Sequence, residues 1–219
     1  MNRHTTRLLL AAILLGLPAS LGACNTSGTR FVAQDDMDAR TVEARKLWAK
    51  ADSLRQNAEH EKDQVERAQA YQKAAEMYRK SLQQREDIGA VWQNLGVCLM
   101  EGERNYMDAG TAFRRAAELL PTDPRPYENL AQAYLRAGWH KESLQYFVES
   151  LDRDPAYLPS LRGHAVLVQT LMVSDEPSLE RLQRALLLET DPAWRAVIQR
   201  QVFRVERDLA DKPSYASPS

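Results

Sequence analysis

The chain contains 219 residues, of which 44% are hydrophobic and 27% are charged, with 29 Lys and Arg residues against 30 Asp and Glu residues. This composition is typical of a globular protein with enough material for a single repeat domain. The formal net charge of −1, without a basic stripe or a polybasic patch, argues against binding to nucleic acid or to an anionic membrane surface.

The N-terminal segment 1–23 has the features of a secretory leader. Arg3 and Arg7 precede the apolar run 8–17. This run is too short to span a bilayer, which requires about 20 apolar residues. We therefore interpret the segment as a cleaved signal peptide and not as a membrane-spanning helix.

The four residues Leu21-Gly22-Ala23-Cys24 resemble the lipobox of bacterial lipoproteins. That resemblance implies cleavage before Cys24, attachment of a diacylglyceryl group to its sulfur and, usually, acylation of its new amino group. Two or more acyl chains anchor a protein stably in a membrane, whereas one chain is marginal. A plain signal peptide cut nearby, or a cysteine there by chance, is the alternative.

The polar segment 24–37 is interpreted as a lipidated tether between the membrane and the folded domain. On this interpretation the domain belongs to a bacterial cell envelope and faces the periplasm. Asn25 follows the modified cysteine, at the position where enterobacterial lipoproteins of the inner membrane carry Asp. The resemblance therefore favours the outer membrane over the inner membrane.

The first helix pair is expected at 38–58 and 64–84. Apolar residues at helical spacing are Ala44, Leu47, Trp48, Ala51 and Leu54 in the first helix, with Ala74 and Tyr78 in the second. The stretch 59–67 is almost wholly charged or polar and predicts an exposed turn. Its Glu59-His60-Glu61 run is interpreted as solvated charge and not as a metal site, because adjacent helical residues point in different directions.

The stretch 91–155 contains the same helix pair twice. The first copy consists of Trp92, Leu95, Gly96, Leu99, Ala109, Phe113, Ala116 and Pro121, and the second of Tyr127, Leu130, Ala131, Tyr134, Ser143, Phe147, Ser150 and Pro155. The first copy has one more residue in its turn, Glu101 to Asn105. In each copy the first four positions lie on one helix face. Gly96, which has no β-carbon, allows the two helices to approach closely.

This pattern resembles the tetratricopeptide repeat (TPR), whose usual unit is about 34 residues. The resemblance implies an all-α solenoid, in which stacking of neighbouring pairs supplies most of the core. We expect a TPR-type α-solenoid of about four helix pairs plus a C-terminal capping helix, over residues 38–210.

In TPR proteins, ligand peptides lie against the first helices of successive pairs. Carried onto this chain, the peptide-binding positions are Gln93, Asn94, Val97 and Met100 in one pair and Glu128, Asn129, Gln132 and Arg136 in the next. The amides of Asn94 and Asn129 can bind an extended peptide backbone, while Val97 and Met100 provide an apolar floor. The lysines and arginines of the carboxylate-clamp chaperone adaptors are absent at the equivalent positions. An ordinary solvated surface is the alternative.

After Pro155 the pattern weakens. A fourth pair is expected from Leu158, Leu161, Ala165 and Val168, followed by Leu179, Leu182, Leu186 and Leu187. The run Arg162-Gly163-His164 departs from the TPR pattern, so its packing is uncertain from sequence. A capping helix is expected from Pro192 to about Leu209, with Phe203 off its apolar stripe as an exposed aromatic or a contact with another chain. Residues 211–219 are expected to be a disordered tail.

Catalytic and metal-binding signatures are absent from the sequence. There is no HExxH pair, GxSxG turn, Walker motif or GxGxxG after a strand. His60, His140 and His164 lie in different repeat segments, and Cys98 is interpreted as a packing residue. We therefore expect no enzymatic activity, no cofactor and no metal.

The sequence predicts a membrane-anchored scaffold or adaptor that binds another protein or peptide in the bacterial cell envelope, for example during assembly of an envelope complex. The alternative is a structural lipoprotein that self-associates and has no peptide groove. The identity of the partner is not encoded in any motif of the sequence.

Overall fold

The structure is a computed structural model that describes residues 27–211, with side chains from Met37 onward. The predicted leader, Cys24 and the segment 212–219 lie outside the described residues. The chain divides into two units, 1–36 and Met37–Ser219. The helical repeats belong to the second unit, which is described by itself.

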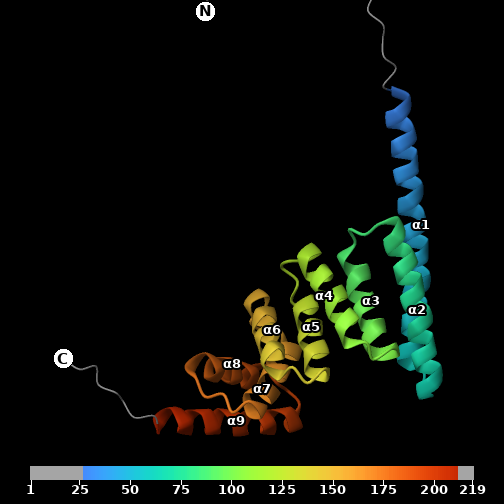
Figure 1. Ribbon diagram of the computed structural model, residues 1–219. Coiled ribbons are helices and arrows are strands. Elements are labelled where there is room, and N and C mark those ends of the chain that lie inside the picture. The colour runs from blue at the N-terminus through green and yellow to red at the C-terminus, as the bar shows by residue number, and fades with distance from the viewer. Residues whose placement is uncertain (1–26, 212–219) are drawn as a thin grey trace, which may run out of the picture. The chain divides into compact units, whose positions relative to one another are not determined.

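The described residues form nine α-helices and no strand (Figure 1). Their bounds are α1 (Ser27–His60), α2 (Gln64–Gln84), α3 (Gly89–Gly102), α4 (Tyr106–Leu119), α5 (Pro124–Arg136), α6 (His140–Arg153), α7 (Leu158–Thr170), α8 (Glu176–Leu188) and α9 (Pro192–Ala210). Consecutive helices pair from α1–α2 to α7–α8, and α9 packs on α7 and α8. The prediction of an all-α chain with four pairs and a final helix is confirmed.

Helix α1 begins at Ser27 and not near the predicted Asp38. The segment 27–37 lacks the apolar periodicity on which the prediction was based. Once a helix is nucleated, each added residue gains a hydrogen bond, so a helix can extend beyond its apolar stripe. Periodicity thus located the packed part of α1 and not its first residue.

Aspartates cap the N-termini of several helices. They stand where the sequence passes from a turn to apolar residues at helical spacing. The Asp63 carboxylate accepts hydrogen bonds from the amides of Val65 at 2.8 Å and Glu66 at 3.0 Å. Asp123, Asp175 and Asp191 cap α5, α8 and α9 in the same way, each with a proline in the first turn of its helix. These caps satisfy amide groups that have no partner within the helix.

Two buried phenylalanine rings lie at the centre of the helix packing. Phe113 and Phe147 have no exposed surface. A β-carbon added to Gly96 would lie 2.5 Å from Cε1 of Phe113, and one added to Gly163 would collide with Phe147. Gly163 is therefore a site of close packing, whereas the sequence pattern had left the packing of this stretch uncertain.

Buried serines join second helices to first helices. The Ser81 hydroxyl of α2 donates to the Ala44 carbonyl of α1 at 2.8 Å. The Ser143 and Ser150 hydroxyls of α6 donate to carbonyls of α5, those of Ala131 at 2.7 Å and Pro124 at 2.9 Å. A hydroxyl therefore replaces a repeat alanine without leaving an unpaired buried group.

The apolar core has two large parts. One is built from α1 to α5, and the other from α6 to α9. A small cluster of Ala131, Phe147 and Leu167 lies between them. Leu187 of α8, which was expected in the apolar set, is 85% exposed. That prediction is wrong because Leu182 and Ala185 already fill the buried face of the helix.

Arginine side chains fix the C-terminal helix. The Arg204 guanidinium of α9 donates to the carbonyls of Val168 at 3.1 Å and Val173 at 3.0 Å, at the C-terminal end of α7. It also bonds Asp208 and the Ser174 hydroxyl. The Val168 carbonyl also accepts from the Val173 amide at 3.0 Å, so the Arg204 guanidinium reinforces the turn that ends α7 and joins it to α9.

A second arginine pair closes the turn between α8 and α9. Arg162 of α7 makes a two-bond ion pair with Glu189, at 2.7 and 2.8 Å. The Glu189 carboxylate also accepts from the amides of Thr190 and Asp191. Chiefly because of Arg162, the pKa of Glu189 is lowered to about 2.

Truncation of either central phenylalanine is expected to destabilise the fold strongly. Phe113→Ala or Phe147→Ala should each lower the free energy of unfolding by about 3–5 kcal/mol, because a buried ring is lost and a cavity remains. Urea unfolding monitored by circular dichroism measures the change. Phe203→Ala, at a side chain that is 69% exposed, is the control and should change stability by less than about 0.5 kcal/mol. Similar losses for all three variants would contradict this packing.

His164 makes the stability of the fold depend on pH in the acid range. It is 1% exposed, and neither ring nitrogen has a hydrogen-bond partner among the described residues. Burial, together with the nearby Arg181, lowers its pKa from 6.5 to about 4. Between these two pH values the unfolded chain binds more protons than the folded chain, so stability falls as the pH falls.

At pH 4 this single group is expected to cost about 3 kcal/mol of stability relative to pH 7. Urea unfolding at pH 7, 6 and 5 should show a smaller loss of stability for His164→Leu than for the unmodified chain. His60→Gln, at an exposed histidine, is the matched control and should keep the full loss. Parallel pH profiles for the unmodified chain and His164→Leu would contradict the assignment.

Candidate peptide-binding surface

The predicted peptide-binding positions lie on first helices that are neighbours in space. Helix α3 lies beside α5, and α5 lies beside α7, although a second helix separates each pair in the chain. Asp52 of α1 contacts α3. We call the surface carried by these helices the first-helix surface, defined by Asp52, Gln93, Asn94, Val97, Glu101, Glu128, Asn129, Gln132 and Arg136.

At the α1 end of this surface, the Asp52 carboxylate accepts two hydrogen bonds. Its Oδ1 atom accepts from the Asn94 amide at 3.0 Å and from the Tyr78 hydroxyl at 2.5 Å. Burial and this bond raise the pKa of Tyr78. Beside them, Arg55 pairs with Glu59. The Asn94 amide predicted to bind a peptide is therefore already engaged.

Asp52 was missed in the sequence analysis, although a signal was present. It directly follows Ala51, as Val97 follows Gly96 and Gln132 follows Ala131 in the next two pairs. The longer turn of the first pair shifts its numbering relative to the others. Alignment on the small residue of the first helix would have found it.

In the middle of the surface, an ion pair connects α5 to α3. The Arg136 guanidinium lies 2.8 Å from the Glu101 carboxylate, and the two side chains are 41% and 34% exposed. Such a pair contributes modestly to stability, because solvent screens it. Arg136 therefore presents a guanidinium that is partly neutralised in the absence of a ligand.

Glu128 has the least compensated charge among the predicted positions. Its side chain is half-buried, and its Oε1 atom accepts a hydrogen bond from the Gln132 amide at 3.2 Å. Burial raises its pKa, and the bond from Gln132 opposes that rise. Within residues 37–211 no cationic side chain is paired with this carboxylate.

Two predicted polar residues remain available. Gln93 and Asn129 are half-buried, and their side-chain amides bond to no group within the described part of the chain. Asn129 follows Glu128 in α5, and successive helical side chains point in different directions, so the amide and the carboxylate offer separate contacts to a ligand. This combination can hold both a peptide backbone and a cationic side chain.

The predicted apolar floor is smaller than expected. Val97 is half-buried and borders the core. Met100 is 5% exposed and belongs to the core itself, so its role as an exposed floor is not supported. On a helix that packs against both α2 and α4, a residue at this spacing faces a neighbour and not the solvent.

The described residues offer little for other chemistry. Burial raises the pKa of the Cys98 thiol to about 12, so the thiol is inert at neutral pH. Between residues 27 and 211, no group of three or more His, Cys, Asp or Glu side chains could hold a metal ion. None of the helices in this range combines the length and apolarity needed to cross a membrane.

Two curated proteins show sequence similarity to this chain. Hsp70-Hsp90 organizing protein 2 of Arabidopsis thaliana is 29% identical over 168 residues, which cover 68% of this chain and 29% of that protein. The peroxisomal targeting signal receptor of Eremothecium gossypii is 27% identical over 117 residues, or 53% of this chain and 20% of that protein. The chain thus spans less than a third of either relative. No known protein-family profile matches it.

Solved structures establish the fold. The first TPR of Spaghetti (RPAP3) bound to the HSP90 peptide SRMEEVD superposes with a TM-score of 0.53 at 14% identity, covering 61% of this chain and 96% of that one. MamA superposes with a TM-score of 0.50 at 13% identity, covering 67% and 92%. The fold is the all-α TPR solenoid that the repeated pattern predicts.

Proposed function

We propose that this chain is a TPR scaffold that binds an extended segment of another protein along its first-helix surface. The observation that carries the proposal is the half-buried Glu128 carboxylate, which has only the Gln132 amide as a partner among the described residues. The bound HSP90 peptide in the Spaghetti structure supports peptide binding as a use of this fold. Such a role requires no catalytic step.

The preferred ligand carries a lysine or arginine. A half-buried carboxylate with only an amide partner gains a charge-assisted hydrogen bond when a cationic side chain reaches it. Asp52 adds negative charge at the α1 end of the surface, whereas Arg55 and Arg136 are paired with Glu59 and Glu101. The net field therefore favours a basic segment over an acidic one.

We further propose that lipid on Cys24 anchors this scaffold in the bacterial cell envelope, facing the periplasm, with the outer membrane favoured. The support is the leader and the Leu21-Gly22-Ala23-Cys24 sequence. An anchored scaffold of this kind suits the assembly of an envelope complex, because it holds its partner beside the membrane.

A second candidate function is self-association. The observation that favours it is Phe203, which is 69% exposed on the terminal helix. A large exposed aromatic on a rigid helix is a common anchor of protein contacts. On this alternative the lipoprotein is structural, and the first-helix surface binds no peptide.

Selection of peptides by display on the full-length chain in detergent is expected to enrich sequences with Lys or Arg. Glu128→Gln should weaken a selected peptide by about tenfold or more, because it removes one charged hydrogen bond. Fluorescence polarisation measures the dissociation constants. Glu142→Gln, at an exposed acid on the second helix α6, is the charge-matched control and should bind normally.

The peptide SRMEEVD, which carries three acidic residues against one arginine, provides a net-acidic probe. It is expected to bind at least about tenfold more weakly than a selected basic peptide, because Glu128 and Asp52 repel its carboxylates. Tighter binding of SRMEEVD, or equal effects of Glu128→Gln and Glu142→Gln, would contradict the proposed site.

The lipid anchor is tested by labelling cells with an alkyne analogue of palmitate. The unmodified chain should take up label and sediment with membranes, while Cys24→Ser should do neither, because it lacks the acylated sulfur. Cys98→Ser is the matched control and should retain label, since the Cys98 thiol is buried. Label that persists in Cys24→Ser would exclude this anchor.

A further inference from the structure

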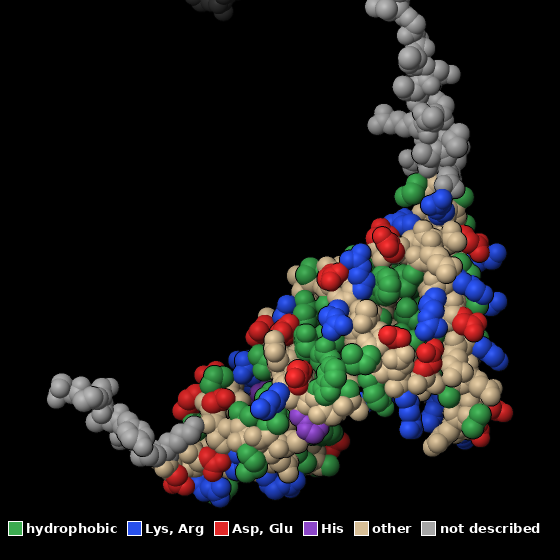
Figure 2. Space-filling view, in the orientation of Figure 1, with side chains coloured by type: hydrophobic (Ala, Val, Ile, Leu, Met, Phe, Trp, Pro, Cys, Tyr) green, Lys and Arg blue, Asp and Glu red, His purple; other side chains and the backbone are tan. Residues whose placement is uncertain are grey.

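A hollow lies between α2 and α4, over α3, and none of its lining residues belongs to the first-helix surface. Its volume is about 560 Å³, and its wall is mainly apolar. Leu82, Leu95, Leu99 and Ala112 form the floor together with Trp92. Figure 2 shows hydrophobic side chains gathered over α3 to α5 on the viewed face. We call this hollow the α2–α4 cavity.

The repeat symmetry of the chain shows what such a cavity accommodates. In the next pair, Tyr134 takes the place of Leu99, and Tyr146 takes the place of Ala112. The two tyrosine rings stack with centroids 5.2 Å apart, and Trp139 stacks on Tyr134 at 5.3 Å. Aromatic rings therefore fill, in the second copy of the repeat, the space that smaller side chains leave open in the first.

The arginines of the preceding helices, Arg79 in α2 and Arg114 in α4, differ in the same way between the two copies. Arg114 donates to the Tyr134 hydroxyl at 2.7 Å. Its counterpart Arg79 has no tyrosine to bond and pairs with Glu103 at 3.4 Å instead. The α2–α4 cavity is thus a place for an aromatic ring that this chain does not supply from its own repeat.

The rim of the cavity is acidic. Glu86 and Asp108 are exposed, Asp108 accepts a hydrogen bond from the neutral Asn105 amide at 2.8 Å, and Arg79 is already paired with Glu103. The Glu86 carboxylate makes no hydrogen bond or ion pair within the described part of the chain. An occupant that presents an aromatic ring next to a cation matches both the floor and the rim.

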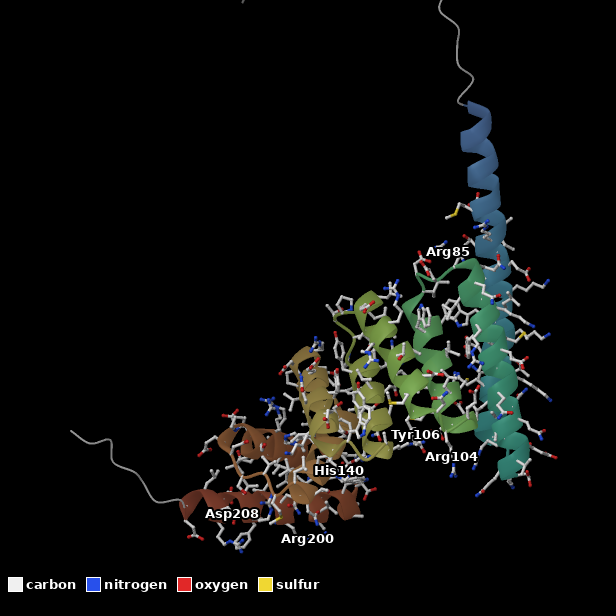
Figure 3. The ribbon with its side chains drawn as sticks, viewed as in Figure 1. Arg85, Arg104, Tyr106, His140, Arg200 and Asp208 are labelled. Atoms are coloured by element: carbon white, nitrogen blue, oxygen red, sulfur yellow. The ribbon has the colours of Figure 1, made fainter. Side chains whose placement is uncertain are left out.

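Helix α9 presents that combination on its exposed face. Phe203 is 69% exposed, and Arg200 lies one turn before it, with no partner among the described residues. Figure 3 shows Arg200 on the side of α9 that faces away from α8, whereas Asp208 lies on the side toward α8. The bonds of Arg204 to α7 hold this face in place, so the ring is presented by a fixed helix.

We propose that Phe203 of a second copy of this chain inserts into the α2–α4 cavity, with Arg200 of that copy against Glu86 and Asp108. This inference specifies the self-association candidate and does not depend on peptide binding at Glu128. Donor and acceptor are different surfaces, so the contact is heterologous. The assembly closes when each of two copies inserts its Phe203 into the cavity of the other, or it propagates as a chain of molecules.

The test measures the mass of the full-length chain in detergent by sedimentation velocity over a range of concentrations. The unmodified chain should associate. Phe203→Ser and Ala112→Tyr, which fills the cavity as Tyr146 fills its counterpart, should each weaken association by roughly ten- to a hundredfold. Leu187→Ser, at another exposed apolar residue, is the control and should associate normally.

If Ala112→Tyr disturbs folding, exchanging the charges of Glu86 and Arg200 provides an independent test. Glu86→Arg and Arg200→Glu should each weaken association, and the double variant should restore it, because the pair is reformed with opposite signs. Thermal unfolding confirms that each variant is folded.

Each other outcome overturns the proposal. If Phe203→Ser abolishes association but neither the filled cavity nor the charge exchange has an effect, Phe203 docks elsewhere. If the filled cavity matters and Phe203→Ser does not, a different side chain occupies the cavity. Absence of association at all concentrations removes self-association as well, while binding of basic peptides at Glu128 is judged separately by its own assay.

Discussion

Close contact between phenylalanine rings and glycine backbones sets the helix spacing on which the rest of the structure depends. The Phe113 ring occupies the space that Gly96 leaves free, and Phe147 does the same at Gly163. Hydroxyl bonds mark close approach at other helix pairs, from Ser81 of α2 to α1 and from Ser143 and Ser150 of α6 to α5. Apolar packing therefore fixes the geometry, and the buried hydroxyls then become satisfied within it.

Polar side chains hold α9, the last helix of the described residues, against α7 and α8. Arg204 donates hydrogen bonds to two carbonyls at the end of α7, and Glu189 accepts hydrogen bonds from Arg162 and two backbone amides in the turn before α9. These groups do the work that the next helix pair performs elsewhere in the solenoid. His164 is the exception, because its ring is enclosed without a polar partner and is therefore kept neutral.

The sequence predicted the fold well, because periodicity and caps are local signals. Phe113, Phe147 and the Asp-Pro turns each define their element within a few neighbouring residues. The first-helix surface was predicted less completely, because its contacts join distant residues: Asp52 bonds Asn94 across 42 positions. Whether an amide is free or already bonded depends on such contacts, and no spacing rule reports it. Similarly, the α2–α4 cavity appears only when two copies of the repeat are compared in three dimensions.

The division of the core into two parts has a consequence for how the molecule opens. Residues of α1 to α5 form one cluster and those of α6 to α9 form the other, with Phe147 in the small cluster between them. In a solenoid, each segment is stabilised chiefly by its immediate neighbours. Because buried serine bonds join α6 to α5, amide protons of α7 to α9 would then exchange with solvent as one cooperative group, distinct from those of α2 to α4. A partner held on α3 and α5 would remain bound while the C-terminal helices open and close.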